Sequence, residues 1–174
     1  MRALIVYESM FGDTERVARA VAEGLRSHMS VDLVAADQAP APLTELVDLV
    51  VVGGPTHAFS MPRQSTREDA VRQGAHAVST VTGIREWIDH LRAGPHSEKV
   101  ATFDTRIAKA RHMPGSAAKA AAKGMRRHGY STLVKPESFY VDDVAGPLRP
   151  GELERARAWG EKLAAEVSHP ADAR

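Results

Sequence analysis

The 174-residue chain contains no cysteine, which excludes structural disulfides, thiolate metal ligands and every mechanism that uses a cysteine nucleophile. Only 5% of its residues are aromatic. No run approaches the 18 or so consecutive apolar residues that a membrane-spanning helix needs, so no membrane association is predicted. The first residues lack the basic and apolar regions of an export signal, so we expect a cytoplasmic protein.

Net charge is close to zero, with 23 basic and 22 acidic residues, so the overall field favours neither nucleic acid nor a basic partner. One stretch departs from this balance, because residues 105–135 include basic residues and no acidic one. The basic residues are Arg106, Lys109, Arg111, Lys119, Lys123, Arg126, Arg127 and Lys135. We expect one side of the molecule to be electropositive.

Short, nearly unbroken apolar runs at 2–7, 47–53 and 100–103 are typical of central strands in a parallel sheet with helices on both faces. The alternating segment 31–34 suits a strand nearer the edge. The segment 132–141 suits an edge strand too, because it is interrupted by Pro136, which cannot donate to a strand ladder.

Between these runs, apolar residues recur at helical spacing. The four stripes are Val17, Val21 and Leu25; Ile84, Trp87, Ile88 and Leu91; Ala118, Ala121, Ala122 and Met125; and Leu153, Ala156, Trp159 and Leu163. A short helix is also expected near 43–46. The alternation of strands and helices predicts an α/β, doubly wound, five-stranded parallel sheet in a single domain over residues 1–167, with a flexible tail at 168–174.

The segment 63–75, RQSTREDAVRQGA, is the polar exception. It is compatible with a mobile flap over a site, and also with a solvated helical turn or loop. The second interpretation is favoured, because charge runs usually only face water.

The loop YESMFGDTE, residues 7–15, joins the first strand to the first predicted helix. At this place in a parallel sheet, the amides of the helix N-terminus point into the crevice and favour an anion. Ser9 and Thr14 add hydroxyl donors, and Gly12 lets the backbone curl. Asp13 or Thr14 is expected to cap the helix.

Known anion-binding motifs narrow the class of anion that this loop could bind. The loop has neither G-x-x-x-x-G-K-[ST] of nucleoside triphosphate sites nor G-x-G-x-x-G of dinucleotide sites. A receiver domain would need an aspartate where Gly53, Gly54 and Pro55 stand, and a low-molecular-weight phosphatase would need a cysteine. No metal site is predicted either. A phosphate monoester held by amides and hydroxyls remains.

Three segments carry a resemblance to a known family. Ser9-Met10-Phe11-Gly12-Asp13-Thr14 resembles the loop that binds the FMN phosphate in flavodoxin-like proteins, although the usual motif has Asn at the position of Asp13. GGPTHAFSMPR, residues 53–63, is similar to the loop beside the flavin ring, with Pro55, Thr56, His57, Ala58 and Phe59 nearest the ring. FDTR, residues 103–106, stands where the family has its second ring loop and contributes Asp104, Thr105 and Arg106.

The resemblance covers nearly the whole chain and implies the strand order 2-1-3-4-5. It implies an FMN-binding protein that acts in electron transfer, with a redox protein partner or a small-molecule electron acceptor. Electron-carrier flavodoxins enclose the ring between Trp and Tyr and are strongly acidic. This chain has His57 and Phe59 on one ring loop and no aromatic residue among Asp104, Thr105 and Arg106, and its net charge is close to zero. Two alternatives therefore stay open: an FMN-dependent reductase of a quinone-like small molecule, and a cofactor-free binding module of the same fold.

Two further expectations concern single residues. Arg106, if it lies near the N1 and O2 edge of the flavin, would stabilise the anionic reduced ring. Alternatively, the Arg106 side chain points to solvent and does not contact the flavin. Trp87 and Trp159 lie on apolar helical stripes, so both are expected to be packing residues.

Overall fold

The computed structural model describes residues 1–43, 45–76 and 79–169. Its strands are β1 (Arg2–Tyr7), β2 (Ser30–Ala35), β3 (Leu49–Pro55), β4 (Lys99–Ile107), β5 (Ser131–Thr132) and β6 (Glu137–Val141). Its helices are α1 (Asp13–Arg26), α2 (Gln64–Arg72), α3 (Ile84–Asp89), α4 (Ala117–Arg127) and α5 (Glu152–Ser168), with a short 3₁₀ turn at Ala108–Ala110.

The strands form one parallel sheet in the order β2-β1-β3-β4-β5, which confirms the predicted order. The expected fifth strand over 132–141 is divided in two. β5 pairs with the first residues of β4, and β6 pairs with Phe103 to Ile107 further along the same strand. Pro136 lies in the gap, where its missing N–H is not needed by the ladder.

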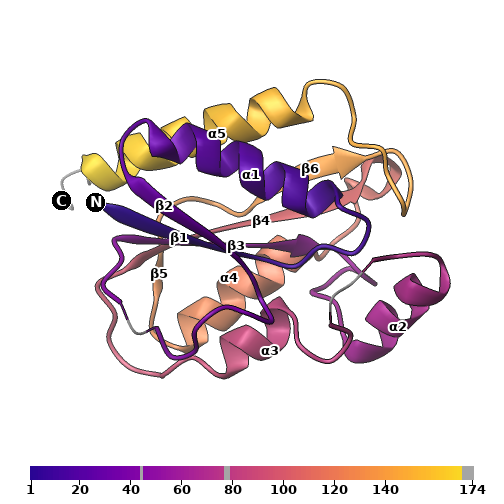
Figure 1. The fold of residues 1–174 in the computed structure, drawn as a ribbon, viewed down its shortest axis with the longest axis horizontal. Helices are drawn as coiled ribbons and strands as arrows, with labels where there is room; N and C mark the ends of the chain where they lie inside the picture. Colours follow the sequence, from indigo (N-terminus) through magenta and orange to yellow (C-terminus); the bar gives the residue numbers. More distant parts are fainter. Residues whose placement is uncertain (44, 77–78, 170–174) are drawn as a thin grey trace.

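Helices cover both faces of this sheet, with α1 and α5 on one side and α3 and α4 on the other (Figure 1). Successive residues of a strand point to opposite faces, so Ala3 and Ile5 join the core under α1 and α5, whereas Leu4 and Val6 join the core under α3 and α4. All four predicted helical stripes pack against these two cores.

The two tryptophans are packing residues, as the stripes predicted. Trp159 of α5 makes edge-to-face contacts with Phe103 and Phe139, with ring centroids 6.1 and 6.0 Å away. Trp87 of α3 is 2% exposed, and its indole N–H donates to the carbonyl of Pro40 at 3.0 Å. Buried aromatic groups of this kind stabilise a core through area and ring geometry.

α1 and α5 approach one another until their backbones touch. A Cβ atom placed on Gly160 of α5 would lie 2.3 Å from the carbonyl oxygen of Val21 in α1. A Cβ atom on Gly24 of α1 would lie 2.1 Å from the carbonyl oxygen of Arg157 in α5. Both distances are shorter than any van der Waals contact, so only glycine fits at this crossing.

The polar segment 63–75 contains α2, and the expectation that its charges only face water is wrong at Arg67. Asp69 and Arg72 are exposed, but Arg67 is completely buried. Its guanidinium donates to Glu8, directly after β1, at 2.5 Å and to Glu86 of α3 at 2.7 Å. Two carboxylates compensate the buried cation, which is the condition under which a charge tolerates burial.

The ends of the domain meet at the amino edge of the sheet (Figure 1). The hydroxyl of Ser168, at the end of α5, lies 3.9 Å from the sulfur of Met1. Residues 170–174 of the expected tail lie outside the described residues. The expected helix at 43–46 includes residue 44, which also lies outside them, and its neighbours Leu43 and Glu45 are not helical. Among the helices of the described residues, none is long and apolar enough to cross a membrane.

Candidate functional site

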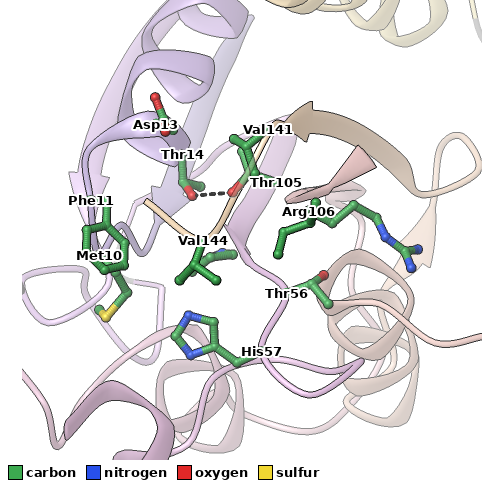
Figure 2. Close-up of a pocket in the computed structure, with 12 residues that line it drawn as sticks. Met10, Phe11, Asp13, Thr14, Thr56, His57, Thr105, Arg106, Val141 and Val144 are labelled. Atoms are coloured by element: carbon green, nitrogen blue, oxygen red, sulfur yellow. Dashed lines mark hydrogen bonds between the residues drawn. The ribbon is translucent and has the colours of Figure 1, made fainter. Parts of the chain in front are cut away.

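A cavity lies at the carboxyl ends of β1, β3 and β4 (Figure 2). Its apolar lining consists of Met10, Phe11, Pro55, Ile107, Val141 and Val144. Its polar lining consists of Asp13, Thr14, Thr56, His57, Thr105 and Arg106. Apolar walls with a few convergent polar groups suit a flat organic ligand that carries a polar end.

The first turn of α1 borders this cavity. The helix begins at Asp13, and its N-cap is Gly12 in the left-handed region with φ 97°. The expectation that Asp13 or Thr14 caps the helix is wrong, because both are its first residues. The Ser9 hydroxyl accepts hydrogen bonds from the amides of Gly12 at 3.2 Å and Glu15 at 3.3 Å and so shapes the loop. The first amides of a helix have no intrahelical acceptor, and the positive end of its dipole favours an anion here.

The Asp13 carboxylate is turned away from the centre of the cavity (Figure 2). It lies 3.5 Å from the guanidinium of Arg16 and against Gly146, where a Cβ atom would come within 2.2 Å of it. Burial raises the pKa of Asp13, and the charge of Arg16 opposes that rise. The negative charge is therefore partly compensated outside the cavity.

Hydroxyl groups supply the polar contacts of the cavity. Thr14 and Thr105 are 2% and 5% exposed, and their hydroxyl oxygens lie 2.7 Å apart across the junction of α1 and β4 (Figure 2). The Thr56 hydroxyl accepts from the amide of Ala117 at 2.9 Å. Its proton remains available to another acceptor, because a hydroxyl both donates and accepts.

Residues 104–106 do not form the expected ring loop, because β4 continues through them to Ile107. Asp104 is buried and accepts from the amide of Ala118 at 3.0 Å, which caps α4. Burial raises the pKa of Asp104, and hydrogen bonds from the groups around it oppose that rise. Helix amides and backbone carbonyls satisfy these polar residues only in part, because Asp104 Oδ1 and Arg106 Nε are buried without a hydrogen-bond partner among the described residues.

Arg106 follows neither expectation made for it. It is 6% exposed, and its guanidinium donates to the carbonyls of Ala110 at 2.5 Å and Met113 at 3.3 Å. The guanidinium points away from the cavity, and only the rest of the residue lines it (Figure 2). The Arg106 charge is thus committed to holding the segment after β4.

The structure brings nine of the sequence-predicted site residues together and leaves five out of the lining. Those in the lining are Met10, Phe11, Asp13, Thr14, Pro55, Thr56, His57, Thr105 and Arg106. Those outside it are Ser9, Gly12, Ala58, Phe59 and Asp104. Sequence reasoning missed Ile107, Val141 and Val144. Ile107 and Val141 end β4 and β6, and the rule that ligands bind at the carboxyl ends of parallel strands could have found them.

The His57 ring lies below Val144 in Figure 2, with Met10 and Phe11 to its left. Its Nδ1 atom is 3.1 Å from the hydroxyl of Thr66 in α2. Burial, and secondly the charge of Arg67, lower the pKa of His57 to about 4. The imidazole is therefore neutral at pH 7.

The basic stretch is largely exposed on α4, where Lys119, Lys123, Arg126 and Arg127 face solvent. Arg106 does not contribute to this surface, because it is buried. In the part of the chain that the structure describes, no cluster of three His, Cys, Asp or Glu residues could hold a metal ion.

The known proteins to which this chain is similar are flavodoxins. The flavodoxin family model matches residues 5–78. Flavodoxin FldP of Pseudomonas aeruginosa (strain UCBPP-PA14) is 31% identical over 96 residues, which is 53% of this chain. The match spans 48% of that protein, so about half of its length.

Solved structures of flavodoxins share the fold. A flavodoxin from the domain Archaea superposes with a TM-score of 0.64 at 19% identity, covering 97% of this chain and 100% of the other. Oxidised Flavodoxin 1 from Bacillus cereus superposes with a TM-score of 0.66 at 15% identity, covering 97% of both chains.

Proposed function

Because the chain belongs to the flavodoxin-like family, we propose that it binds FMN in the cavity at the ends of β1, β3 and β4 and uses it in electron transfer. When bound, FMN supplies the redox chemistry by accepting and giving up electrons. One observation carries the proposal: a single cavity joins a helix N-terminus, three threonine hydroxyls and apolar walls.

The residues present fit this cofactor. The first turn of α1 and the Thr14 hydroxyl would hold the phosphate, because amides and hydroxyls are its natural donors in the absence of a cation. The apolar wall formed by Phe11, Ile107 and Val144 would receive the ring and exclude water from it. The guanidinium of Arg106 is engaged elsewhere, so it is not part of this donor set.

The proposal is tested by the colour and the ligand preference of the protein. We expect the purified protein to be yellow, or to become so with FMN. In calorimetry, FMN should bind more tightly than riboflavin by at least about 1.5 kcal/mol, the value of one hydrogen bond to a charged group. Equal affinity for the two ligands would contradict a phosphate site at α1, and no binding of either would remove the proposed function.

Thr14→Ala should weaken FMN binding by about 0.5–1.5 kcal/mol, because one hydroxyl at the end of α1 is lost and the Thr105 hydroxyl loses its partner. Thr132→Ala is the matched control, since Thr132 lies on β5, which pairs with the amino end of β4 far from the cavity. Fluorescence titration of FMN with the three proteins measures the difference. An effect of Thr132→Ala as large as that of Thr14→Ala would speak against a local role of Thr14.

The identity of the electron partner is the finer part of the proposal. We infer a one-electron carrier that serves a redox protein partner, with a small-molecule acceptor as the other possibility. Family membership supports electron transfer in general, and it favours neither the quinone-like reductase nor the cofactor-free module. Retention of FMN would remove the cofactor-free alternative.

A further inference from the structure

The loop after β3 is held in a tight turn that fixes the position of His57. The amide of His57 donates to the carbonyl of Ser60 at 2.9 Å, and the Ser60 amide returns the bond at 3.0 Å. Ala58 and Phe59 between them take positive φ values of 46° and 62°, which non-glycine residues rarely adopt. Such strain persists where the surroundings over-determine the backbone, and it is found often at binding sites.

The hydrogen bonds of Thr66 indicate which nitrogen of His57 carries the proton. The Thr66 oxygen accepts from the amide of Arg63 at 2.9 Å, and its hydroxyl has the Arg63 carbonyl as an acceptor at 3.0 Å. With its one proton on that carbonyl, the same oxygen accepts from Nδ1 of His57, 3.1 Å away. This arrangement places the His57 proton on Nδ1 and leaves Nε2 as a bare acceptor.

We propose that His57 is held by Thr66 as the Nδ1–H tautomer and presents an unprotonated Nε2 to the cavity, where it accepts a hydrogen bond from an N–H group of the bound flavin. The second half of this proposal rests on the proposed function. Figure 2 shows the ring directed into the space bordered by Met10, Phe11 and Val144.

The charged groups around His57 are consistent with a neutral ring. Arg67, behind it on α2, is positive and disfavours a second proton. The negative charges of Glu8 and Glu86 could favour a protonated His57, but both carboxylates are paired with Arg67. Asp13 borders the same cavity but faces Arg16.

The other cations near this loop are Arg63 and Arg85. Arg85 donates to the carbonyls of Met61 and Pro62 at 2.6 and 3.1 Å. Arg63 is exposed at the start of α2. Both are positive, so neither favours protonation of the imidazole.

A neutral acceptor discriminates between the two oxidation states of a flavin. Two electrons and two protons convert the oxidised ring into its fully reduced neutral form, which carries N–H groups at two nitrogens that are bare when oxidised. An acceptor without a proton cannot donate to a bare nitrogen, but it can bind an N–H group. We assign the bond of His57 to one of the two nitrogens that gain a proton on reduction, and not to N3, which carries a proton in both states, so His57 should favour reduced FMN over oxidised FMN.

The first half is tested on the ligand-free protein, so its outcome does not depend on FMN binding. Long-range proton–nitrogen NMR spectra at pH 7 should show His57 protonated on Nδ1. Thr66→Val removes the acceptor of that proton and should shift the ring toward a mixture of tautomers. Finding the proton on Nε2 in the wild-type protein would overturn the proposal.

The second half is tested by measuring the affinity of the apoprotein for oxidised FMN and, under anaerobic conditions, for reduced FMN. His57→Phe keeps a flat ring but removes Nε2, so the preference for the reduced form should fall by about two- to twelve-fold, the worth of one hydrogen bond. His28→Phe, at an exposed position near the end of α1, should leave the ratio unchanged.

The two experiments distinguish a failure of the assigned hydrogen bond from a failure of FMN binding. An unchanged ratio in His57→Phe would overturn the assigned hydrogen bond while leaving FMN binding in place. Absence of FMN binding by the wild-type protein would overturn the proposed function and the ligand half together, while the tautomer result stands by itself.

Discussion

Arg67→Met is expected to lower the free energy of unfolding by about 3–5 kcal/mol, the usual cost of removing one partner of a buried ion pair. Methionine fills a similar volume, so the loss comes mainly from the charges left behind. Glu8 is 6% exposed and would keep its amide partner from Ile84 at 3.0 Å, but it would lose the cation. Urea unfolding monitored by circular dichroism measures the change.

Two further variants test whether the loss of stability comes from the buried charges. Arg72→Met lies on the same helix, and its exposed pair with Asp69 should be worth no more than about 1 kcal/mol. Adding Glu8→Gln to Arg67→Met removes one of the two uncompensated carboxylates and should restore part of the stability. A loss in Arg67→Met no larger than in Arg72→Met would show that the buried ion pairs contribute little.

The same ion pairs give stability a definite pH dependence. Burial by itself would raise the pKa of Glu86, but hydrogen bonds from Arg67 and from the amide of Gly83 outweigh burial and lower it. A carboxyl group whose pKa is lowered by folding stabilises the protein above its unfolded pKa, near 4.5, and this contribution is lost as pH falls through the folded value. Arg67→Met should reduce this part of the acid sensitivity.

Gly160→Ala is expected to lower the free energy of unfolding by about 1–3 kcal/mol, although alanine is the better helix former by nearly 1 kcal/mol. The new methyl group would lie 2.3 Å from the carbonyl of Val21, so α1 and α5 must move apart. The clash is with a backbone atom of α1, so no side-chain rotation relieves it. Thermal or urea unfolding tests the prediction.

Gly124→Ala is the matched control for this substitution. Gly124 also lies inside a helix, but the nearest atom to its Cβ position is a side-chain methyl of Ile88 at 3.1 Å, which can shift. We expect its stability to lie within about 1 kcal/mol of the wild type. If Gly160→Ala proved equally mild, the close helix crossing would not be a strict requirement.

The fold could be predicted because its signals are local and repeated. The apolar run 2–7 coincides with β1, and the stripe of Val17, Val21 and Leu25 is fully buried under α1. Strand order follows from the family resemblance, and the parallel pairing confirms it. Boundaries were less accurate where polar residues continue a strand, as in β4, because a polar residue in a strand end is indistinguishable from a loop residue in sequence.

The site was predicted only where a contiguous motif carries it. The lining residues within 10–14, within 55–57 and within 105–106 come from three such motifs. The partners of Arg67 are 59 and 19 residues away along the chain, so no local pattern shows that this one charge of a polar helix is buried. Similarly, Val144 reaches the cavity only because the segment after β6 packs against α1, which is a tertiary contact.

The meeting of Met1 and Ser168 at the amino edge of the sheet has a practical consequence for attaching this domain to other objects. Because the strands are parallel, the cavity at the carboxyl ends of β1, β3 and β4 lies at the opposite end of the sheet, one strand length away. A tag, a second domain or an electrode surface attached next to Met1 or Ser168 therefore leaves the cavity mouth open. Immobilisation beside these residues would turn the cavity toward the solution, and a donor fused there would reach it only through a linker long enough to pass around the sheet.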